Sequence, residues 1–208
     1  DLIAGGLLQN SGPLALQNLA RWNGTTWSSF GGTNNLVYAL TRMPNGDVIA
    51  GGAFTSIGGL LVDRVARWDG SSWVAMGLGL FGDVTALVGL PDGSVVAGGQ
   101  FTSPGPYCAR WDGASWVGVQ AFGFRPTSAI RCLAALPDGD VVAGGAEWNY
   151  TSSLPPAQVR TNLARLDLSG PVPMWSSLDL HGASVVNVAM LPDGSLSLQS
   201  QADLTSLE

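Results

Sequence analysis

Short apolar runs alternate with turn residues along the whole chain, and one such run recurs with a glycine pair at its end. It is found as Leu2–Gly6, Val48–Gly52, Val95–Gly99 and Val141–Gly145. A Pro-Asn-Gly or Pro-Asp-Gly turn precedes the later copies, as at residues 44–46 and 91–93. Proline presets one turn dihedral and glycine accepts a positive φ, so each turn predicts a hairpin that joins two strands.

A second hairpin follows in each copy, with Ala-Arg-Trp before its turn and another tryptophan after it. It spans residues 19–27, 65–73 and 108–116, and recurs in degraded form at 163–175. Each repeat therefore predicts four strands, a to d: strand b carries the glycine pair, c the Ala-Arg-Trp and d the second tryptophan. The apolar runs are too short, and too often cut by glycine, to indicate a helix. The predicted fold class is all-β, built of four-stranded antiparallel sheets.

These markers resemble the repeats of kelch and galactose-oxidase type β-propellers, and most closely those of large secreted bacterial repeat proteins. That family has a glycine pair closing the second strand, an aromatic residue in the third and tryptophan in the fourth. The resemblance covers residues 1 to about 195. It implies a β-propeller with about four blades per chain and a secreted or cell-surface location. Counterparts of the copper ligands of galactose oxidase are missing, so that activity is not implied.

The repeats are expected at about 1–46, 47–93, 94–139 and 140–194, within a single propeller domain or propeller fragment that covers residues 1–208. Residues 195–208 are expected to be a degenerate partial repeat, with an artificial junction at the end. A fifth strand a, Val185–Met190, could complete the first sheet of the same chain or of a second chain. A four-bladed monomer, a dimer forming a larger ring and a piece of a longer array all stay open, and self-association is slightly favoured.

The charge balance excludes two classes of partner. Charged residues make up only 12% of the chain, the net charge is −6, and all nine basic residues are arginines. Nucleic acids and anionic membranes need a basic surface, so neither is expected as a partner. The two cysteines, Cys108 and Cys132, fall in predicted strands and are expected to be small buried hydrophobic residues, with a bridge between neighbouring blades as the alternative.

Residues that recur in every repeat are most simply explained by what every blade needs. The glycine pairs are expected to let strands or blades approach closely, and the tryptophan pairs to fill the wedge between blades. Each recurring arginine is expected to bind a turn carboxylate or a loop carbonyl, with a ring of arginines for an anionic ligand as the alternative. The structural residues so predicted include Gly51, Gly52, Arg67, Trp68, Trp73, Gly98, Gly99, Arg110, Trp111 and Trp116.

In a propeller blade the short a–b and c–d turns lie at one end of the strands, the short-turn edge, and the b–c and d–a loops lie at the other end, the long-loop edge. The b–c and d–a loops vary between repeats, so the long-loop edge is the predicted functional face. Its most irregular segment replaces the Phe-Thr-Ser of two other repeats. It is the predicted ligand site for a sugar or peptide and consists of Glu147, Trp148, Asn149 and Tyr150. The alternative is a longer loop in which Trp148 is only a plug.

Few residues in the chain could support catalysis. His181 is the only histidine, so a His-based zinc site cannot be assembled, and a serine triad would need His181 with Asp179. We therefore expect no catalytic residues, no cofactor, no metal site and no enzyme. The expected function is a non-catalytic scaffold or interaction domain, or a trimmed or engineered array of repeats. The alternatives are a carbohydrate- or peptide-binding propeller and, less favoured, a hydrolase that uses Glu147.

Overall fold

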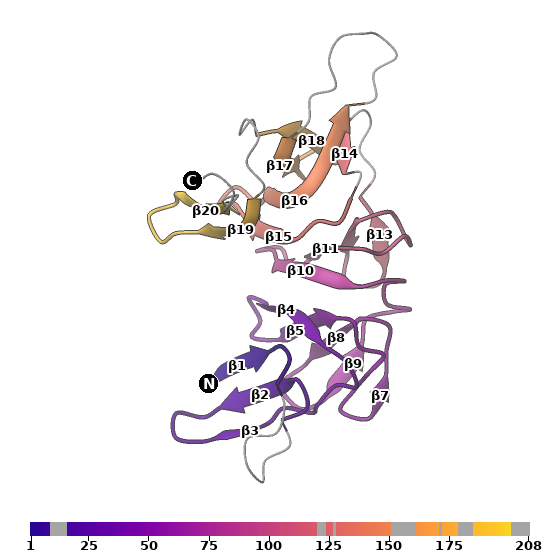
Figure 1. Cartoon of the computed structure of the whole chain (residues 1–208), viewed down its shortest axis with the longest axis vertical. Helices are drawn as coiled ribbons and strands as arrows, with labels where there is room; N and C mark the ends of the chain where they lie inside the picture. Colours follow the sequence, from indigo (N-terminus) through magenta and orange to yellow (C-terminus); the bar gives the residue numbers. More distant parts are fainter. Residues whose placement is uncertain are drawn as a thin grey trace, which may run out of the picture. The chain divides into compact units, whose positions relative to one another are not determined.

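The computed structural model describes residues 1–8, 16–119, 124–126, 128–150, 161–170, 172–178 and 185–200. These residues contain no helix, and their regular structure is antiparallel β-strand throughout (Figure 1). The chain divides into two compact units, Asp1–Gly118 and Val119–Glu208.

The first unit contains three consecutive sheets. The first sheet has the order β1 (Leu2–Gly5), β2 (Leu19–Trp22) and β3 (Trp27–Ser29). The second has the order β4 (Val37–Arg42), β5 (Val48–Gly52), β8 (Val65–Trp68) and β9 (Trp73–Ala75). The third has the order β10 (Val84–Gly89), β11 (Val95–Gly99), β12 (Cys108–Trp111) and β13 (Trp116–Gly118). A small hairpin, β6 (Ser56–Ile57) and β7 (Leu60–Leu61), lies within the loop between β5 and β8.

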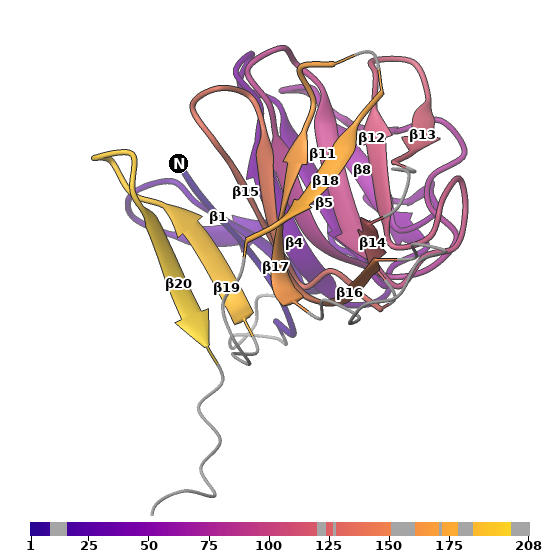
Figure 2. The same ribbon diagram turned by 90° about the horizontal axis from the view of Figure 1, so that it is seen from above.

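The second unit has one larger sheet and one hairpin. The sheet contains β14 (Phe124–Pro126), β15 (Cys132–Ala135), β16 (Val141–Tyr150), β17 (Thr161–Asp167) and β18 (Met174–Ser177). Its main path is β15, β16, β17 and β18, and β14 pairs with the far end of β16. The hairpin is β19 (Val185–Met190) with β20 (Leu196–Ser200), shown in yellow in Figure 2. The predicted fold class, an all-β chain of four-stranded antiparallel sheets in the order a-b-c-d, is confirmed.

One predicted loop is a strand. Residues 147–150 were expected to begin an irregular b–c loop, but their backbone continues β16 without a break. The pairing of Phe124–Pro126 with this segment supplies the missing partner. A register irregularity between Gly144 and Trp148 marks where the strand leaves the regular blade. The prediction failed because a non-local partner decides whether an extended segment becomes a strand.

In the first two sheets, the first glycine of the pair makes room for a valine of the next sheet. A Cβ atom added at Gly51 would lie 2.6 Å from Cγ1 of Val84, and one at Gly5 would lie 2.7 Å from Cγ1 of Val37. These distances are too short for any side chain, so glycine is required where successive sheets approach closely.

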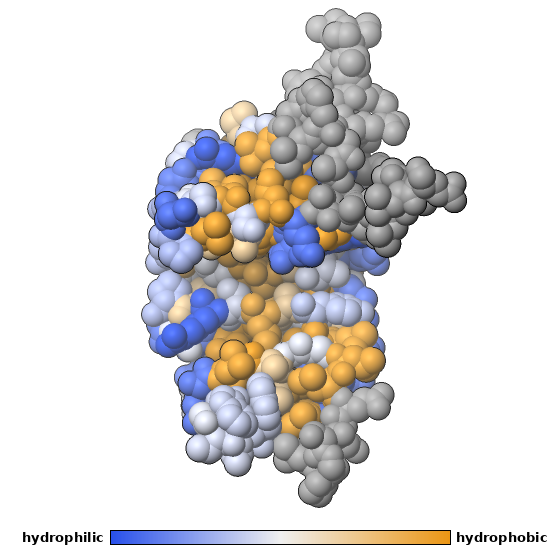
Figure 3. Space-filling model, turned by 60° about the vertical axis from the view of Figure 1, so that its left-hand side comes forward, coloured by the Kyte–Doolittle hydropathy of each residue, from blue (hydrophilic) through white to orange (hydrophobic). Residues whose placement is uncertain are grey.

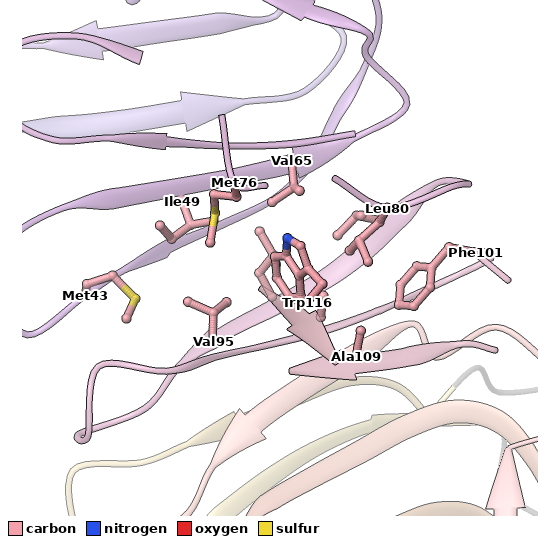
Figure 4. Packing of buried hydrophobic residues seen from close by; sticks show 12 residues of the cluster. Met43, Ile49, Val65, Met76, Leu80, Val95, Phe101, Ala109 and Trp116 are labelled. Atoms are coloured by element: carbon pink, nitrogen blue, oxygen red, sulfur yellow. The ribbon is translucent and has the colours of Figure 1, made fainter. Parts of the chain in front are cut away.

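An apolar cluster fills the space between the second and third sheets. Figure 4 shows Trp116 at its centre, Leu80 and Phe101 at one end, and Met43, Ile49, Met76 and Val95 at the other. In the preceding wedge, between the first and second sheets, the indole nitrogen of Trp73 donates a hydrogen bond to the carbonyl of Phe30 at 3.1 Å. Trp73 and Trp116 of strand d are therefore packing residues that join their sheet to the one before it.

Candidate functional site

The two edges of the sheets are built differently, and the edge with the short turns is the more regular. In the sheets that have an a–b turn, the arginine of strand c lies against that turn. Arg165 donates from Nε to Asp140 and from Nη2 to Asp138, both at 2.7 Å. Arg110 donates from Nη2 to Asp92 at 2.6 Å and from Nε to the hydroxyl of Ser94 at 3.1 Å. Charged hydrogen bonds of this kind fix a guanidinium in place.

Arg67 is held less completely than these two arginines. Its Nε lies 3.3 Å from Oδ2 of Asp47, and the side chain is 43% exposed. The aspartate of the Pro-Asp-Gly turn is here replaced by Asn45, whose amide donates to that same Oδ2 at 2.9 Å. An amide NH₂ group cannot accept a hydrogen bond, so Arg67 lacks the acceptor that Asp92 and Asp138 provide elsewhere.

In the c–d turns of the same edge, the side chain of the first residue accepts hydrogen bonds from the backbone of the turn. In one of them Oδ1 of Asp69 accepts hydrogen bonds from the backbone N–H groups of Ser71 and Ser72, both at 2.9 Å. The bonds from Ser72 and Ser71 lower the pKa of Asp69 to about 2. Asn23 occupies the equivalent position in the first sheet and accepts from Thr25 and Thr26 in the same way.

The opposite edge carries the long loops, and backbone hydrogen bonds join them to one another. The N–H of Leu80 donates to the carbonyl of Asp63 at 3.1 Å, which links the d–a loop to the b–c loop before it. The N–H of Thr102 donates to the carbonyl of Phe81 at 3.3 Å, which links the same d–a loop to the b–c loop after it. These loops therefore have a defined backbone although their sequences vary.

One buried ring anchors each of two b–c loops, while other apolar side chains of this edge reach solvent. Phe54 and Phe101 are fully buried. Leu61, Leu78 and Phe81 are 82%, 84% and 58% exposed and come from the adjoining loops just described. On the face of the molecule that Figure 3 shows, apolar residues also reach the surface among polar ones. Apolar side chains that form a contiguous exposed patch are typical of contact surfaces.

The predicted ligand residues Glu147, Trp148, Asn149 and Tyr150 are consecutive in β16. By backbone pairing, Trp148 lies opposite Pro126 and Thr161, while Asn149 and Tyr150 lie opposite Arg125 and Phe124. The side chains of the four residues lie outside the part of the chain that the structure describes, so a shared binding platform stays a prediction. His181 and Asp179 also lie outside the described residues.

Sequence reasoning missed one recurring backbone feature at this edge. The residue before strand c has a positive φ in three sheets: 69° at Asn18, 65° at Arg64 and 65° at Tyr107. Its carbonyl accepts a hydrogen bond from the second glycine of the pair in each case. Asparagine is a common choice for this conformation, but arginine and tyrosine are not, so only one of the three copies carried a signal.

The thiols and the acidic groups of the described residues indicate neither a reactive cysteine nor a metal site. Cys108 and Cys132 are free and buried. Burial raises the pKa of both thiols, that of Cys132 to about 11, so neither is ionised near neutral pH. Within the described ranges, no cluster of three or more His, Cys, Asp or Glu residues could hold a metal ion. The described residues also contain no helix long and apolar enough to cross a membrane.

Several solved structures share the fold of this chain. A putative gluconolactonase matches with a TM-score of 0.55 and 15% identity, over 88% of this chain and 63% of that one. The extracellular domains of a putative one-component and a putative hybrid two-component system from B. thetaiotaomicron match with TM-scores of 0.51 and 0.52. Both are 16% identical, over 90% of this chain and 24% of theirs. No protein-family model and no curated protein sequence matches.

At these identities the likeness shows the fold alone, and that fold is a β-propeller. It also corrects one expectation. The inference that the chain is not an enzyme is wrong, because a protein named for a hydrolase activity shares the fold. The inference rested on a search for local motifs. Active sites are assembled from residues that are distant in sequence, so a shortage of such motifs does not exclude one.

Proposed function

We propose that this chain is a ligand-binding propeller module of a secreted or cell-surface protein, and that its long-loop edge binds a peptide segment of a partner. The exposure of Leu61 and Leu78 on loops with a fixed backbone is the observation that carries this proposal. A loop that serves only as a connection gains nothing from holding leucine in water.

The architecture of these loops supports a preformed surface. The b–c loop of the second sheet contains the β6–β7 hairpin, and Leu61 is the last residue of that hairpin. Asn34 ties this loop to the preceding d–a loop, since its Oδ1 accepts from the N–H groups of Thr55 and Ser56 at 2.9 and 3.0 Å. Apolar side chains on such a scaffold lose little conformational freedom when they bind, which favours affinity.

Random-peptide phage display on the intact chain tests the proposal. The matched variant carries Leu61→Ser, Leu78→Ser and Phe81→Ser, which are exposed positions whose change should leave the fold intact. The control carries Val172→Ser and Met174→Ser, which are 49% and 63% exposed in the second unit. Peptides should be enriched on the parent chain and on the control and lost on the loop variant. Absence of enrichment, or equal binding to all three proteins, contradicts the proposal.

A carbohydrate is the alternative ligand for this edge, and its candidate residues are Glu147, Trp148, Asn149 and Tyr150. Trp148→Ala on a glycan array separates the two ligands. Sugar binding that disappears in Trp148→Ala supports the carbohydrate, because stacking on an aromatic ring is a main source of sugar affinity. Sugar binding that is absent, or unchanged in this variant, removes the carbohydrate.

Hydrolysis of a sugar lactone is a second candidate function. The similarity to the putative gluconolactonase favours it. Because this chain spans 63% of that chain, an activity of the whole protein is a proposal here. The test is hydrolysis of gluconolactone above the uncatalysed rate, followed by titration of the released acid. Turnover that falls at least about tenfold in Glu147→Gln would support an acidic catalytic group. The uncatalysed rate alone would remove this candidate.

We propose, in addition, that the chain self-associates through strand edges. Within the described residues β1 pairs only with β2, and β19 and β20 pair only with each other. Unpaired strand edges are ready to pair with another strand. Strand β19 of one chain would then complete the first sheet of its partner. Size-exclusion chromatography with light scattering should give the mass of two chains, and a clean single-chain mass contradicts this proposal.

A further inference from the structure

A groove opens between the second and third sheets on the short-turn edge, away from the long loops. Its volume is about 230 Å³. Arg67, Asp47 and Asn45 contribute polar groups to its lining, and Met76 and Trp111 are among its apolar residues. In Figure 4 the apolar lining residues Met43, Ile49, Met76 and Val95 lie together at one end of the cluster. The groove therefore combines apolar side chains with one cation, Arg67, and two carboxylates, Asp47 and Asp92.

The cation has an unused hydrogen-bonding capacity. Nε of Arg67 is buried and has no hydrogen-bond partner among the described residues, although it lies 3.3 Å from Asp47. Asp47 shares the oxygen concerned with the amide of Asn45. Leaving a buried N–H donor of a guanidinium without an acceptor is costly.

The fourth repeat shows what an arginine at this position can hold. Arg165 binds the carboxylates of Asp138 and Asp140 together, each at 2.7 Å. Among the described residues Arg67 forms an ion pair with Asp47 alone, so one ion-paired carboxylate fewer faces it. A second carboxylate at Arg67 would thus reproduce a charge arrangement that this chain already contains.

We propose that this groove binds a small organic carboxylate with an apolar body. The carboxylate accepts hydrogen bonds from Arg67, and the body packs on Met76, Val95 and Trp111. The nearby Asp92 does not repel such a ligand strongly, because Arg110 pairs with it at 2.6 Å. The volume lies below the range of about 300–1,000 Å³ that is usual for drug-sized ligands, so the ligand is a small acid.

The equivalent groove between the first and second sheets provides the control. It has a volume of about 320 Å³, and its recurring arginine, Arg21, already binds Asp1 through two nitrogens. Arg42 lines that groove as well. Replacing Arg42 removes the same charge as replacing Arg67, from the other groove of the same sheet. The two arginines therefore separate a specific site from a general effect of charge.

Titration of the ¹⁵N-labelled chain with sodium benzoate tests the proposal by NMR. The resonances of Arg67 Nε–H and of the Trp111 indole should shift together and saturate. Benzamide has nearly the same shape without the charge and should bind at least about tenfold more weakly.

The decisive variant is Asn45→Asp, which supplies the missing acceptor from the protein itself. It should weaken benzoate binding at least about tenfold, because Arg67 then pairs internally as Arg110 does. Arg67→Lys should weaken binding in the same direction, since lysine lacks the planar fork. Arg42→Ala should leave the affinity unchanged, and dispersed tryptophan resonances in each variant show that the fold is intact.

Three results overturn the proposal: no shift of Arg67 and Trp111 up to the solubility limit of benzoate, an unchanged affinity in Asn45→Asp, or a loss of binding in Arg42→Ala. The function proposed for the long-loop edge is independent of all three, because its test uses substitutions at Leu61, Leu78 and Phe81.

Discussion

The short-turn edge and the long-loop edge of this propeller are stabilised by different kinds of interaction. On the short-turn edge a side chain accepts hydrogen bonds from the backbone of its own turn, as Asp69 does from the N–H groups of Ser71 and Ser72. On the long-loop edge the backbone of one loop bonds to that of the next, as Leu80 does to Asp63. Side-chain bonds require the same kind of residue in each repeat, aspartate or asparagine in these turns, whereas backbone bonds leave the residues free to vary.

This difference explains where the chain repeats and where it does not. Two repeats share Phe-Thr-Ser at the long-loop edge, and the side chain of this run that is fully buried is the ring, that of Phe54 and Phe101. The positions around that ring can change because their backbone groups are satisfied by neighbouring loops. A propeller can thus carry a variable surface at little cost to its stability.

The largest expected effect comes from removing this ring. We expect Phe101→Ala to lower the free energy of unfolding by about 3–5 kcal/mol, because a fully buried ring leaves a cavity that the loops cannot refill. Urea denaturation measured by tryptophan fluorescence checks this. Leu78→Ala, at a position that is 84% exposed, is the control and should change stability by less than about 0.5 kcal/mol. Similar values for both variants would show that the ring does not anchor the loop edge.

The next effect concerns the short-turn edge. Asp140 is buried and accepts hydrogen bonds from Arg165 Nε at 2.7 Å and from the N–H of Leu168 at 3.0 Å. Asp140→Ala should cost about 1–3 kcal/mol, because both donors lose a buried acceptor. Its neighbour Asp138 is 54% exposed, and Asp138→Ala should cost clearly less in the same denaturation experiment. An equal loss in both variants would contradict a turn that depends on its buried carboxylate.

The fold could be predicted because its determinants are local and repeated. Three markers recur at matching positions in the repeats: the glycine pairs, the Pro-Asp-Gly turns and the Ala-Arg-Trp runs. The strands and their order could therefore be predicted from the sequence. The pairing of β14 with the end of β16 could not be predicted, because it occurs once and joins segments without a common marker.

The candidate site could be predicted only as an edge. The variable sequences of the long loops indicated this edge. The exposure of Leu61 and Leu78, however, depends on backbone hydrogen bonds between the loops, and these cannot be predicted from residue type. The groove at Arg67 was hidden for a different reason. The arginine at position 67 recurs in every repeat, so it was assigned a structural role. It lacks one carboxylate acceptor because Asn45 stands where the other turns have aspartate.

Restoring aspartate at position 45 should affect stability less than Asp140→Ala, and in the opposite direction. Asn45→Asp should raise the free energy of unfolding by about 0.2–1 kcal/mol, the usual value of an exposed ion pair, because the new carboxylate can pair with Arg67. Thermal denaturation at low and high salt measures it, and the gain should shrink in salt. In the background of Arg67→Ala the same substitution should give no gain, which isolates the pair. A gain that persists without Arg67 would mean that the turn itself prefers aspartate.

The smallest effect concerns the hydrogen bonds within a single c–d turn of the short-turn edge. The hydrogen bonds from Ser72 and Ser71 lower the pKa of Asp69 from 3.8 to about 2. Because the folded pKa is the lower one, the bonds stabilise the turn fully above the unfolded value near 3.8, and this contribution is lost as pH falls through about 2. The amide resonances of Ser71 and Ser72 should therefore titrate with a midpoint near 2. Asp69→Asn should abolish the titration and keep the turn, as Asn23 does in the first sheet. A midpoint near 3.8 would show that the carboxylate is not held by these two bonds.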